Sequence, residues 1–453
     1  MFNNLLPKRR QPPPHILEVK YYSTNHSTPD VTLQEAVVKG LAADRGLFMP
    51  REIRPLHKEF FDNIQNMTFQ DIAVKVAEAF FGDDIPAADL ETIVRDTLAF
   101  DAPVVPVSAD IYTLELFHGP TLAFKDVGAR FMARLLRYFI GRDTGGREVN
   151  VLVATSGDTG SAVANGFLGV DGIHVYVLYP KGKVSPIQEC QFTTLGKNIT
   201  AVEVDGVFDD CQALVKSAFM DRELCDRMVL TSANSINVAR FLPQAFYYFN
   251  AYARLKAMGR ADHMVVAVPS GNFGNITAGI FAWRMGLPVE HFIAANNAND
   301  IFYQYLLTGE YSPRASVQTI ANAMDVGDPS NFARIIDLFG GDHDAIARLI
   351  SGCTYTDAQI RRTMRDCYEA NGYTLDPHGA CAYRALTEQL KPGQTGVFLE
   401  TAHPAKFKDT VEEAIGAEVA IPAPLAAFMQ GTKQADPVTP DFASFKAYLL
   451  ARQ

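Results

Sequence analysis

Short apolar runs alternate with helical stretches from about residue 101 onward, and this alternation is the strongest constraint on the fold. Runs of this length, apolar throughout, are typical of strands buried on both faces of a parallel sheet. The stretches between them predict helices that cover both faces of that sheet. We therefore expect a mostly parallel α/β architecture. The expected strands are 104–107, 112–117, 149–154, 175–179, 264–268, 292–295 and 396–399, and the expected helices are 124–140, 161–168, 208–220, 239–258 and 275–285.

The segment before residue 100 has a different character. Residues 69–81 and 90–100 place apolar side chains at helical spacing, which predicts a helix-rich region. A chain of 453 residues also exceeds what one hydrophobic core usually supports. Three domains are expected: a helix-rich N-terminal domain at 1–100, a first α/β lobe at 101–260 and a second α/β lobe at 261–453.

Composition excludes several classes of function. The net charge of -10 disfavours nucleic acid and anionic membranes as partners, and no apolar stretch is long enough to span a bilayer. The basic tripeptide at 8–10, followed by three prolines, is expected to be a solvated tail, and residues 1–20 lack the apolar core of a secretory signal. Six cysteines without CxxC pairing or zinc-finger spacing predict neither a disulfide framework nor a metal site. We expect a cytoplasmic protein.

One strand–loop–helix unit occurs twice. VLVATSGDTG at 151–160 is similar to VVAVPSGNFG at 265–274, and each combines an apolar strand, an S-G-x-x-G loop and a helix that begins with small residues. Such a loop suits an anion, because glycines let backbone N–H groups approach it and the helix N-terminus adds positive potential. A tight turn without a ligand is the alternative. The second copy lacks the P-loop lysine and the G-x-G-x-x-G fingerprint, so a compact phosphate fits better than a nucleotide.

Lys125 occupies an unusual position for a lysine. Thr121 is the expected N-cap of the following helix, which puts Lys125 in its first turn among Leu122, Phe124 and Val127. Apolar neighbours and the positive helix end are expected to depress the pKa of Lys125. A neutral amine is what Schiff-base chemistry requires. The alternative, favoured by spacing alone, is a lysine whose stem is buried and whose ammonium reaches solvent.

Two further polar clusters lie at ends of expected elements. Residues 231–240 gather hydroxyls, amides and one guanidinium before a long helix, a set that can bind phosphate or carboxylate. Helix capping by Ser or Asn is the alternative. Residues 400–407 follow a late apolar strand, where open α/β sheets bind ligands. His403 in this cluster, taken alone, is more often a structural hydrogen-bonding residue than a catalyst.

Five motifs, in this order, resemble those of the threonine synthase family: HGPTLAFKD at 118–126, ATSGDTG at 154–160, SANSINVAR at 232–240, VPSGNFGN at 268–275 and TAHPAKF at 401–407. The segment YYST…LQEAVVKGLAADRGLFMP also resembles the opening signature of that family, although Asn25 and Arg45 depart from it. The resemblance spans about 20–410. It implies the tryptophan-synthase-β-like two-lobed pyridoxal-phosphate enzyme fold (fold type II), with an additional helix-rich N-terminal domain.

The resemblance also implies a cofactor and roles for individual residues. Pyridoxal 5'-phosphate is the implied cofactor, with Lys125 as the Schiff-base lysine and catalytic base. Asp158 departs from the asparagine that many relatives in the wider fold place near the ring oxygen of the cofactor. The implied loop around the cofactor phosphate consists of Gly271, Asn272, Phe273, Gly274 and Asn275, and the implied partner of the pyridine nitrogen is Thr401. The substrate carboxylate is expected to bind at Ser156, Asp158 and Thr159. The substrate phosphate is expected near Asn234, Ser235, Asn237 and Arg240, with Lys183 as a looser candidate.

The implied reaction converts O-phospho-L-homoserine and water to L-threonine and phosphate, by γ-elimination and then β-addition of water, as the last step of threonine biosynthesis. A phospholyase or a serine/threonine dehydratase that forms a 2-oxo acid is one alternative, and a non-catalytic ligand-binding relative is another. A nicotinamide-dependent oxidoreductase lacks its fingerprint here. Monomer and homodimer both remain open.

Overall fold

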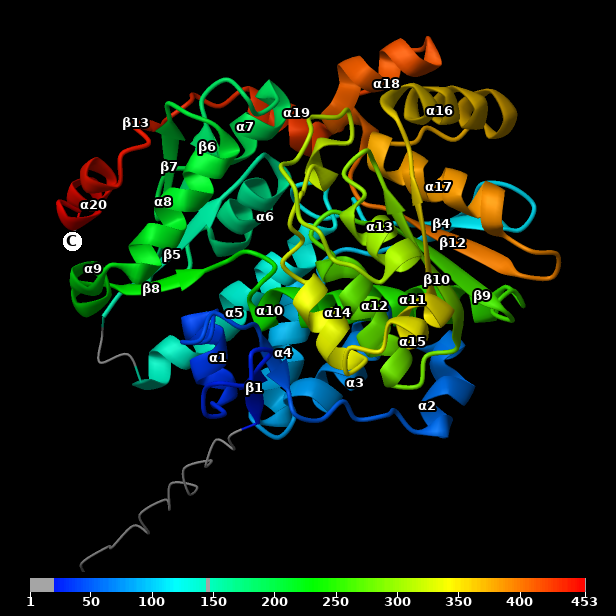
Figure 1. Ribbon diagram of the computed structural model, residues 1–453, viewed down its shortest axis with the longest axis horizontal. Coiled ribbons are helices and arrows are strands. Elements are labelled where there is room, and N and C mark those ends of the chain that lie inside the picture. Colours follow the sequence, from blue (N-terminus) through cyan, green and yellow to red (C-terminus); the bar gives the residue numbers. More distant parts are fainter. Residues whose placement is uncertain (1–19, 144–146, 453) are drawn as a thin grey trace, which may run out of the picture.

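The computed structural model describes residues 20–143 and 147–452, and it shows two sheets with helices packed on and between them (Figure 1). The expected solvated tail at 8–10 lies outside the described residues. Within these ranges no helix is long and apolar enough to cross a membrane.

One sheet has five strands, and every neighbouring pair in it is parallel. Its central strand β6 (Ile173–Pro180) and its neighbour β5 (Val149–Ala154) are almost entirely buried, as expected for strands covered on both faces. The strand order is β13, β7, β6, β5, β8, where β7 is Ile199–Val204, β8 is Val229–Ser232 and β13 is Asp436–Val438.

The other sheet has six strands and is parallel except for the antiparallel edge pair β3–β4. Two strands expected in the first lobe, β3 and β4, lie in this sheet beside strands of the second lobe, so the sheets do not follow the expected division at residue 260. The order is β11, β10, β9, β12, β4, β3, with bounds Ile350–Thr354, Val289–Asn296, Met264–Pro269, Thr395–Glu400, Ile111–Glu115 and Val104–Pro106.

The C-terminal region crosses back to the five-stranded sheet. Residues 421–441 are more than a connection rich in Pro and Ala, because they contain α19 (Ala423–Met429) and strand β13. Beyond them, α20 (Phe442–Leu450) buries Phe445 and Leu449 in the same core cluster as α8 (Phe208–Met220). The chain therefore ends on the lobe opposite the one in which it makes strand β12, as Figure 1 shows.

The N-terminal region is helix-rich, as expected. A small antiparallel sheet of β1 (Tyr21–Ser23) and β2 (Phe48–Pro50) accompanies its helices, and α3 packs against α4 and α11. Thr68 caps α3 by accepting from the N–H of Asp71, and the buried face of α3 joins the main core. The helices are α1 (Leu33–Lys39), α2 (Lys58–Asn63), α3 (Phe69–Phe81) and α4 (Ala87–Thr97).

The central helix α5 (Lys125–Asp143) carries the lysine singled out above and packs against α6, α10 and the N-terminal helix α4 (Figure 1). The expected helix at 239–258 is interrupted at 242–244, where Pro243 has no N–H to continue the helical hydrogen bonds. Helices around the two sheets are α6 (Asp158–Phe167), α7 (Pro186–Thr193), α9 (Arg222–Arg227), α10 (Val238–Phe241), α11 (Ala245–Ala257), α12 (Gly274–Arg284), α13 (Ile301–Thr308), α14 (Phe332–Leu338), α15 (His343–Leu349), α16 (Asp357–Asn371), α17 (Pro377–Gln389) and α18 (Lys408–Ile415).

The close approach of α5 and α10 depends on Gly128. A Cβ at Gly128 would lie 2.4 Å from the carbonyl oxygen of Arg240, whereas one at Gly166 would lie 3.0 Å from its nearest neighbour. We predict that Gly128→Ala lowers the free energy of unfolding by about 1–3 kcal/mol, the usual cost of overpacking. Gly166→Ala is the graded control and should cost clearly less, because its clash is milder. Denaturant titration of both variants measures the difference, and equal losses would contradict this account of the helix contact.

Candidate active site

The second S-G-x-x-G loop connects β9 to the N-terminus of α12, and its backbone N–H groups are left free to bind an anion. Phe273 adopts a left-handed backbone conformation with φ of 61°. Among the described residues, the five backbone N–H groups from Gly271 to Asn275 have no protein acceptor. Unpaired N–H groups at a helix N-terminus are a ready site for phosphate. Gly271 is required here, because a Cβ would lie 2.8 Å from the carbonyl oxygen of Ala323.

Hydrogen bonds from asparagine side-chain amides stabilise the conformation of this loop. The side chain of Asn272 donates to the hydroxyl of Ser235 (2.9 Å), and that of Asn331 donates to the carbonyl of Asn272 (2.9 Å). The side-chain amide of Asn275 donates to the carbonyl of Pro269 (2.8 Å), and the backbone carbonyl of Asn275 accepts from the hydroxyl of Tyr248 (2.7 Å). The side chains of Asn272 and Asn275 therefore shape the loop, and the backbone is left to bind the ligand.

Arg334 anchors this network, and sequence analysis gave it no role. Its fully buried guanidinium donates to the carbonyls of Ser235 (3.1 Å), Ile236 (2.6 Å) and Phe48 (3.1 Å), and it lies 4.0 Å from the ring centroid of Phe241. Burial lowers the pKa of Arg334 to about 9. It joins the N-terminal domain to the second lobe. No local motif indicates this role, because its three backbone-carbonyl partners lie 98 or more residues away in the sequence.

Lys125 is the first residue of α5, so Thr121 is not its N-cap. Thr121 instead donates through its N–H (2.9 Å) and its hydroxyl (2.6 Å) to the carboxylate of Asp126. The Nζ of Lys125 donates to the hydroxyl of Thr159 (3.0 Å) in the first S-G-x-x-G loop. Lys125 is half-buried as a residue.

The pKa of Lys125 is lowered to about 8, in the direction expected from its sequence position. Burial is the largest cause, since it penalises the charged form. The carboxylate of Asp158 acts in the opposite direction, and the charges of Arg240 and Lys406 add to the lowering. A substantial fraction of this amine is therefore neutral near physiological pH.

The first S-G-x-x-G loop offers backbone donors. Thr155 organises it by accepting from the N–H groups of Gly157 (2.9 Å) and Gly160 (2.8 Å). In the part of the chain that the structure describes, the N–H groups of Ser156, Asp158 and Thr159 have no acceptor. These are the residues that the family resemblance assigns to the substrate carboxylate.

The side chain of Asp158 is engaged elsewhere. It accepts from the amide of Gln188 (2.8 Å) and forms an ion pair with Lys406 (2.6 Å). Burial acts to raise the pKa of Asp158, but the charges of Lys406 and Lys125 outweigh it and hold the pKa at about 2. An ionised carboxylate repels a second one, so only the backbone of Asp158 suits a substrate carboxylate.

The polar segment before α10 divides into two roles. Asn237 accepts from the N–H of Ala239 (3.0 Å) and donates to the carbonyls of Val37 (2.9 Å) and Ser232 (3.2 Å). Its amide has no donor left for a phosphate, so Asn237 follows the helix-capping alternative. In contrast, the buried Nε of Arg240 and the buried Oδ1 of Asn234 have no partner among the described residues.

Arg240 is the buried cation of this segment. One of its terminal nitrogens donates to the carbonyl of Ala233, and burial lowers its pKa to about 10. A desolvated guanidinium with an unpaired donor is suited to an anionic ligand. Lys183 lies farther out, in an exposed turn that follows β6 at the same edge of the sheet as the first loop.

Thr401 follows β12 and is tied directly to the start of α5. Its carbonyl accepts from the N–H of Phe124 (2.9 Å), and Ala402 pairs with Ala123 in an antiparallel bridge. The side chain of Thr401 is buried next to the lysine-bearing segment. The threonine and the lysine implied by the family motifs are therefore adjacent in space, although they are far apart in sequence.

The buried acidic residues Glu400 and Asp376 form hydrogen bonds next to Thr401. Glu400 accepts from the N–H of Asp376 (2.5 Å), and Asp376 accepts from the N–H of Ala402 (3.3 Å) and from His378 (2.6 Å). The other ring nitrogen of His378 accepts from the N–H of Ala323 (3.2 Å), the residue that packs over Gly271. Burial and the charge of Asp376 raise the pKa of Glu400 far above its usual value.

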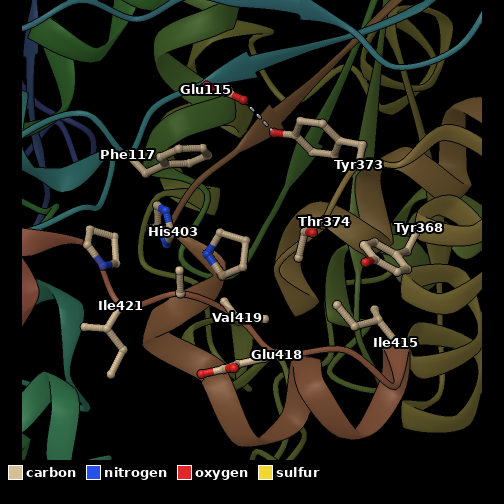
Figure 2. Close-up of a pocket in the computed structure, with 13 residues that line it drawn as sticks. Glu115, Phe117, Tyr368, Tyr373, Thr374, His403, Ile415, Glu418, Val419 and Ile421 are labelled. Carbon is tan, nitrogen blue, oxygen red and sulfur yellow. Dashed lines mark hydrogen bonds between the residues drawn. The ribbon is translucent and has the colours of Figure 1, made fainter.

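A cavity of about 440 Å³ lies near the end of β12 (Figure 2). Two residues that line it are paired: Tyr373 donates to Glu115 (3.0 Å). The other oxygen of that carboxylate is bonded by His118 (2.7 Å), which lies outside the lining. His403 accepts from the N–H of Ala405 (3.1 Å) and caps a short helical turn. His403 thus has the structural role that is usual for an isolated histidine.

The two α/β lobes, the lysine bonded to one S-G-x-x-G loop and the second such loop with unpaired N–H groups together indicate the class of this protein, a pyridoxal-phosphate-dependent enzyme. A model of pyridoxal-phosphate dependent enzymes matches residues 95–401. Solved structures of this class with low sequence identity share the fold; maize serine racemase, 14% identical, covers 76% of this chain and 97% of its own with a TM-score of 0.51.

Two further family models and relatives of higher sequence identity identify the family. Models of the threonine synthase N terminus and C-terminal region match residues 20–98 and 378–449. The threonine synthase of Escherichia coli is 45% identical over 96% of this chain and 100% of its own, and its crystal structure superposes with a TM-score of 0.89. A PLP-bound threonine synthase from Brucella melitensis is 37% identical over 95% and 99% of the two chains, also with a TM-score of 0.89. The chain belongs to the threonine synthase family and is a pyridoxal-phosphate-dependent lyase.

The buried acid Glu400 leads to a prediction about pH. A carboxyl whose pKa is raised in the folded state stabilises the fold below its unfolded pKa, near 4.5, and this contribution is lost as the pH rises. Glu400→Gln keeps the shape and the acceptor for Asp376 but cannot ionise. We expect the free energy of unfolding of this variant, relative to wild type, to increase steadily between about pH 5 and 8. Urea titrations across that range measure it, and a difference that shrinks with rising pH would refute a protonated Glu400.

Proposed function

We propose that the chain converts O-phospho-L-homoserine and water to L-threonine and phosphate, with Lys125 as the Schiff-base lysine. The main support is the position of Lys125, whose amine donates to the first of two loops that have backbone N–H groups without a protein acceptor among the described residues. When bound, pyridoxal phosphate supplies an electron sink for carbanion chemistry. The residues from Gly271 to Asn275 would hold its phosphate, and Thr401 would supply a neutral hydroxyl to its ring nitrogen.

Two separate anion sites fit the two charged ends of this substrate. The N–H groups of Ser156, Asp158 and Thr159 suit its carboxylate. Arg240, with its unpaired Nε, suits its phosphate, and the buried amide oxygen of Asn234 would face the same ligand. Ser235, whose hydroxyl accepts from Asn272, links this site to the cofactor loop, and Lys183 is a peripheral candidate.

The amine of Lys125 is suited to carry protons. With a pKa near 8 it is neither firmly protonated nor a weak base, which is the range in which a general base works best at neutral pH. It would remove the proton at Cα and later act at Cβ. The hydroxyl of Thr159 keeps the amine at one position between these steps. We further propose a reducing, cytoplasmic location, which the six free cysteines support.

Substitution of the lysine tests the central assignment. Lys125→Ala should lower the rate of threonine formation by at least about 100-fold, since positioned proton transfer alone contributes about 100-fold to 10,000-fold. Borohydride reduction of the holoenzyme followed by peptide mapping should place the label on Lys125. Measurement of threonine, phosphate and 2-oxo acid in one reaction separates the proposed function from a dehydratase or phospholyase. A label on another lysine would refute the assignment.

Arg240 gives a second test, directed at the substrate phosphate. Arg240→Ala should raise KM for O-phospho-L-homoserine by about 10-fold or more, because a charge-assisted hydrogen bond to an anion contributes about 1.5–3 kcal/mol. Arg254→Ala is the control, since this arginine of α11 pairs with Asp101 near the surface and should leave KM unchanged. An unchanged KM in the Arg240 variant, with the fold intact by circular dichroism, would exclude the phosphate site.

A further inference from the structure

A second buried lysine lies at the same site as Lys125. The side chain of Lys406 has no solvent exposure, and its Nζ contacts the Asp158 carboxylate (2.6 Å) and the carbonyl of Thr121 (2.9 Å). Lys125 donates to Thr159, the residue after Asp158. Thr121 in turn bonds Asp126, the residue after Lys125. The two amines are thus connected through neighbouring residues of the same two segments.

The site contains an excess of positive charge around one carboxylate. The pKa of Asp158 responds to two cations, Lys406 and Lys125. Lys125 is affected by Asp158, Arg240 and Lys406, while the Asp126 carboxylate on its own helix is occupied by Thr121. Among the described residues Lys125 forms no ion pair, and the carboxylate of Asp158, the residue before its partner Thr159, is bound to Lys406.

We propose that Lys406 is a positioning residue for the Lys125 amine: by occupying the Asp158 carboxylate, its ammonium prevents an ion pair between Asp158 and Lys125 and leaves Lys125 bonded to the neutral hydroxyl of Thr159. A lysine paired with a buried carboxylate remains an ammonium, and an ammonium can neither form a Schiff base nor accept a proton. The pair Asp158–Lys406 therefore keeps the reactive amine available. The inference rests on the proposed role of Lys125.

The energetic cost of leaving the Asp158 carboxylate without a cation predicts how the protonation of Lys125 should change in the variants. A buried carboxylate without its cation is strongly unfavourable, so it takes the nearest remaining one. When Lys406 is removed, that cation is Lys125. When Asp158 is removed as well, no carboxylate remains to capture Lys125, and the amine should again be neutral at moderate pH.

The test follows the rate at which added pyridoxal phosphate forms a Schiff base with the full-length chain, as a function of pH. For the wild-type protein, the pH midpoint of Schiff-base formation should lie at about 8. Lys406→Met should raise this midpoint by roughly one unit or more, the size of shift that a close opposite charge produces. The double variant Asp158→Asn/Lys406→Met should return it to the wild-type value or below, and Lys406→Arg should leave it near wild type.

Reactivity of Lys125 without the cofactor gives an independent readout. An amine-selective acylating reagent, with peptide mapping, should show the same shift in the pH midpoint of Lys125 modification. If Lys406→Met does not fold, Asp158→Asn alone must still lower the midpoint. An unchanged midpoint in the folded Lys406→Met protein, or a double variant as high as the single one, would overturn the inference. Borohydride labelling of a lysine other than Lys125 would instead overturn the proposed function.

Discussion

The hydrogen bond from the N–H of Phe124 to the carbonyl of Thr401 joins the start of the central helix to the end of strand β12. Around it, Ala123 pairs with Ala402, and the N–H of His403 donates to the carbonyl of Leu122 (3.0 Å). This short antiparallel contact fixes the lysine-bearing helix relative to the six-stranded sheet. Without it, the lysine and the threonine proposed to contact opposite parts of the cofactor would have no defined separation.

Buried charges are concentrated around this contact, and each is stabilised differently. Lys406 is neutralised by Asp158, whereas Arg334 is compensated by four hydrogen-bond acceptors without a carboxylate. Burial and the charge of Asp376 raise the pKa of Glu400. Each group thus has local hydrogen-bond or ion-pair partners, whereas the amine of Lys125 donates only to a neutral hydroxyl.

Local patterns predicted individual elements well where one periodicity dominated. The helices at 69–81 and 208–220 and the strand at 149–154 have the expected bounds. Strands β8 and β11 were missed, since β8 is only half buried and β11 contains Gly352, so neither forms a continuous apolar run. Sheet membership was not predictable, because β4 pairs with β12, which lies much later in the chain, and β3 joins the same sheet by pairing with β4.

The sequence by itself determined the chemistry of the protein: two glycine loops suited to anions, a lysine in an apolar first turn, and ordered motifs that match the threonine synthase family. These features are local, so residue type and spacing suffice to recognise them. Only the tertiary structure decided which side chains remain free to act. It assigned the Asn237 side chain to a helix cap, paired Asp158 with Lys406, and brought Arg334 behind the cofactor loop. The helix cap is local, but the other contacts of Asn237, Asp158 and Arg334 depend on partners far away in the sequence, and burial decides which of them must pair.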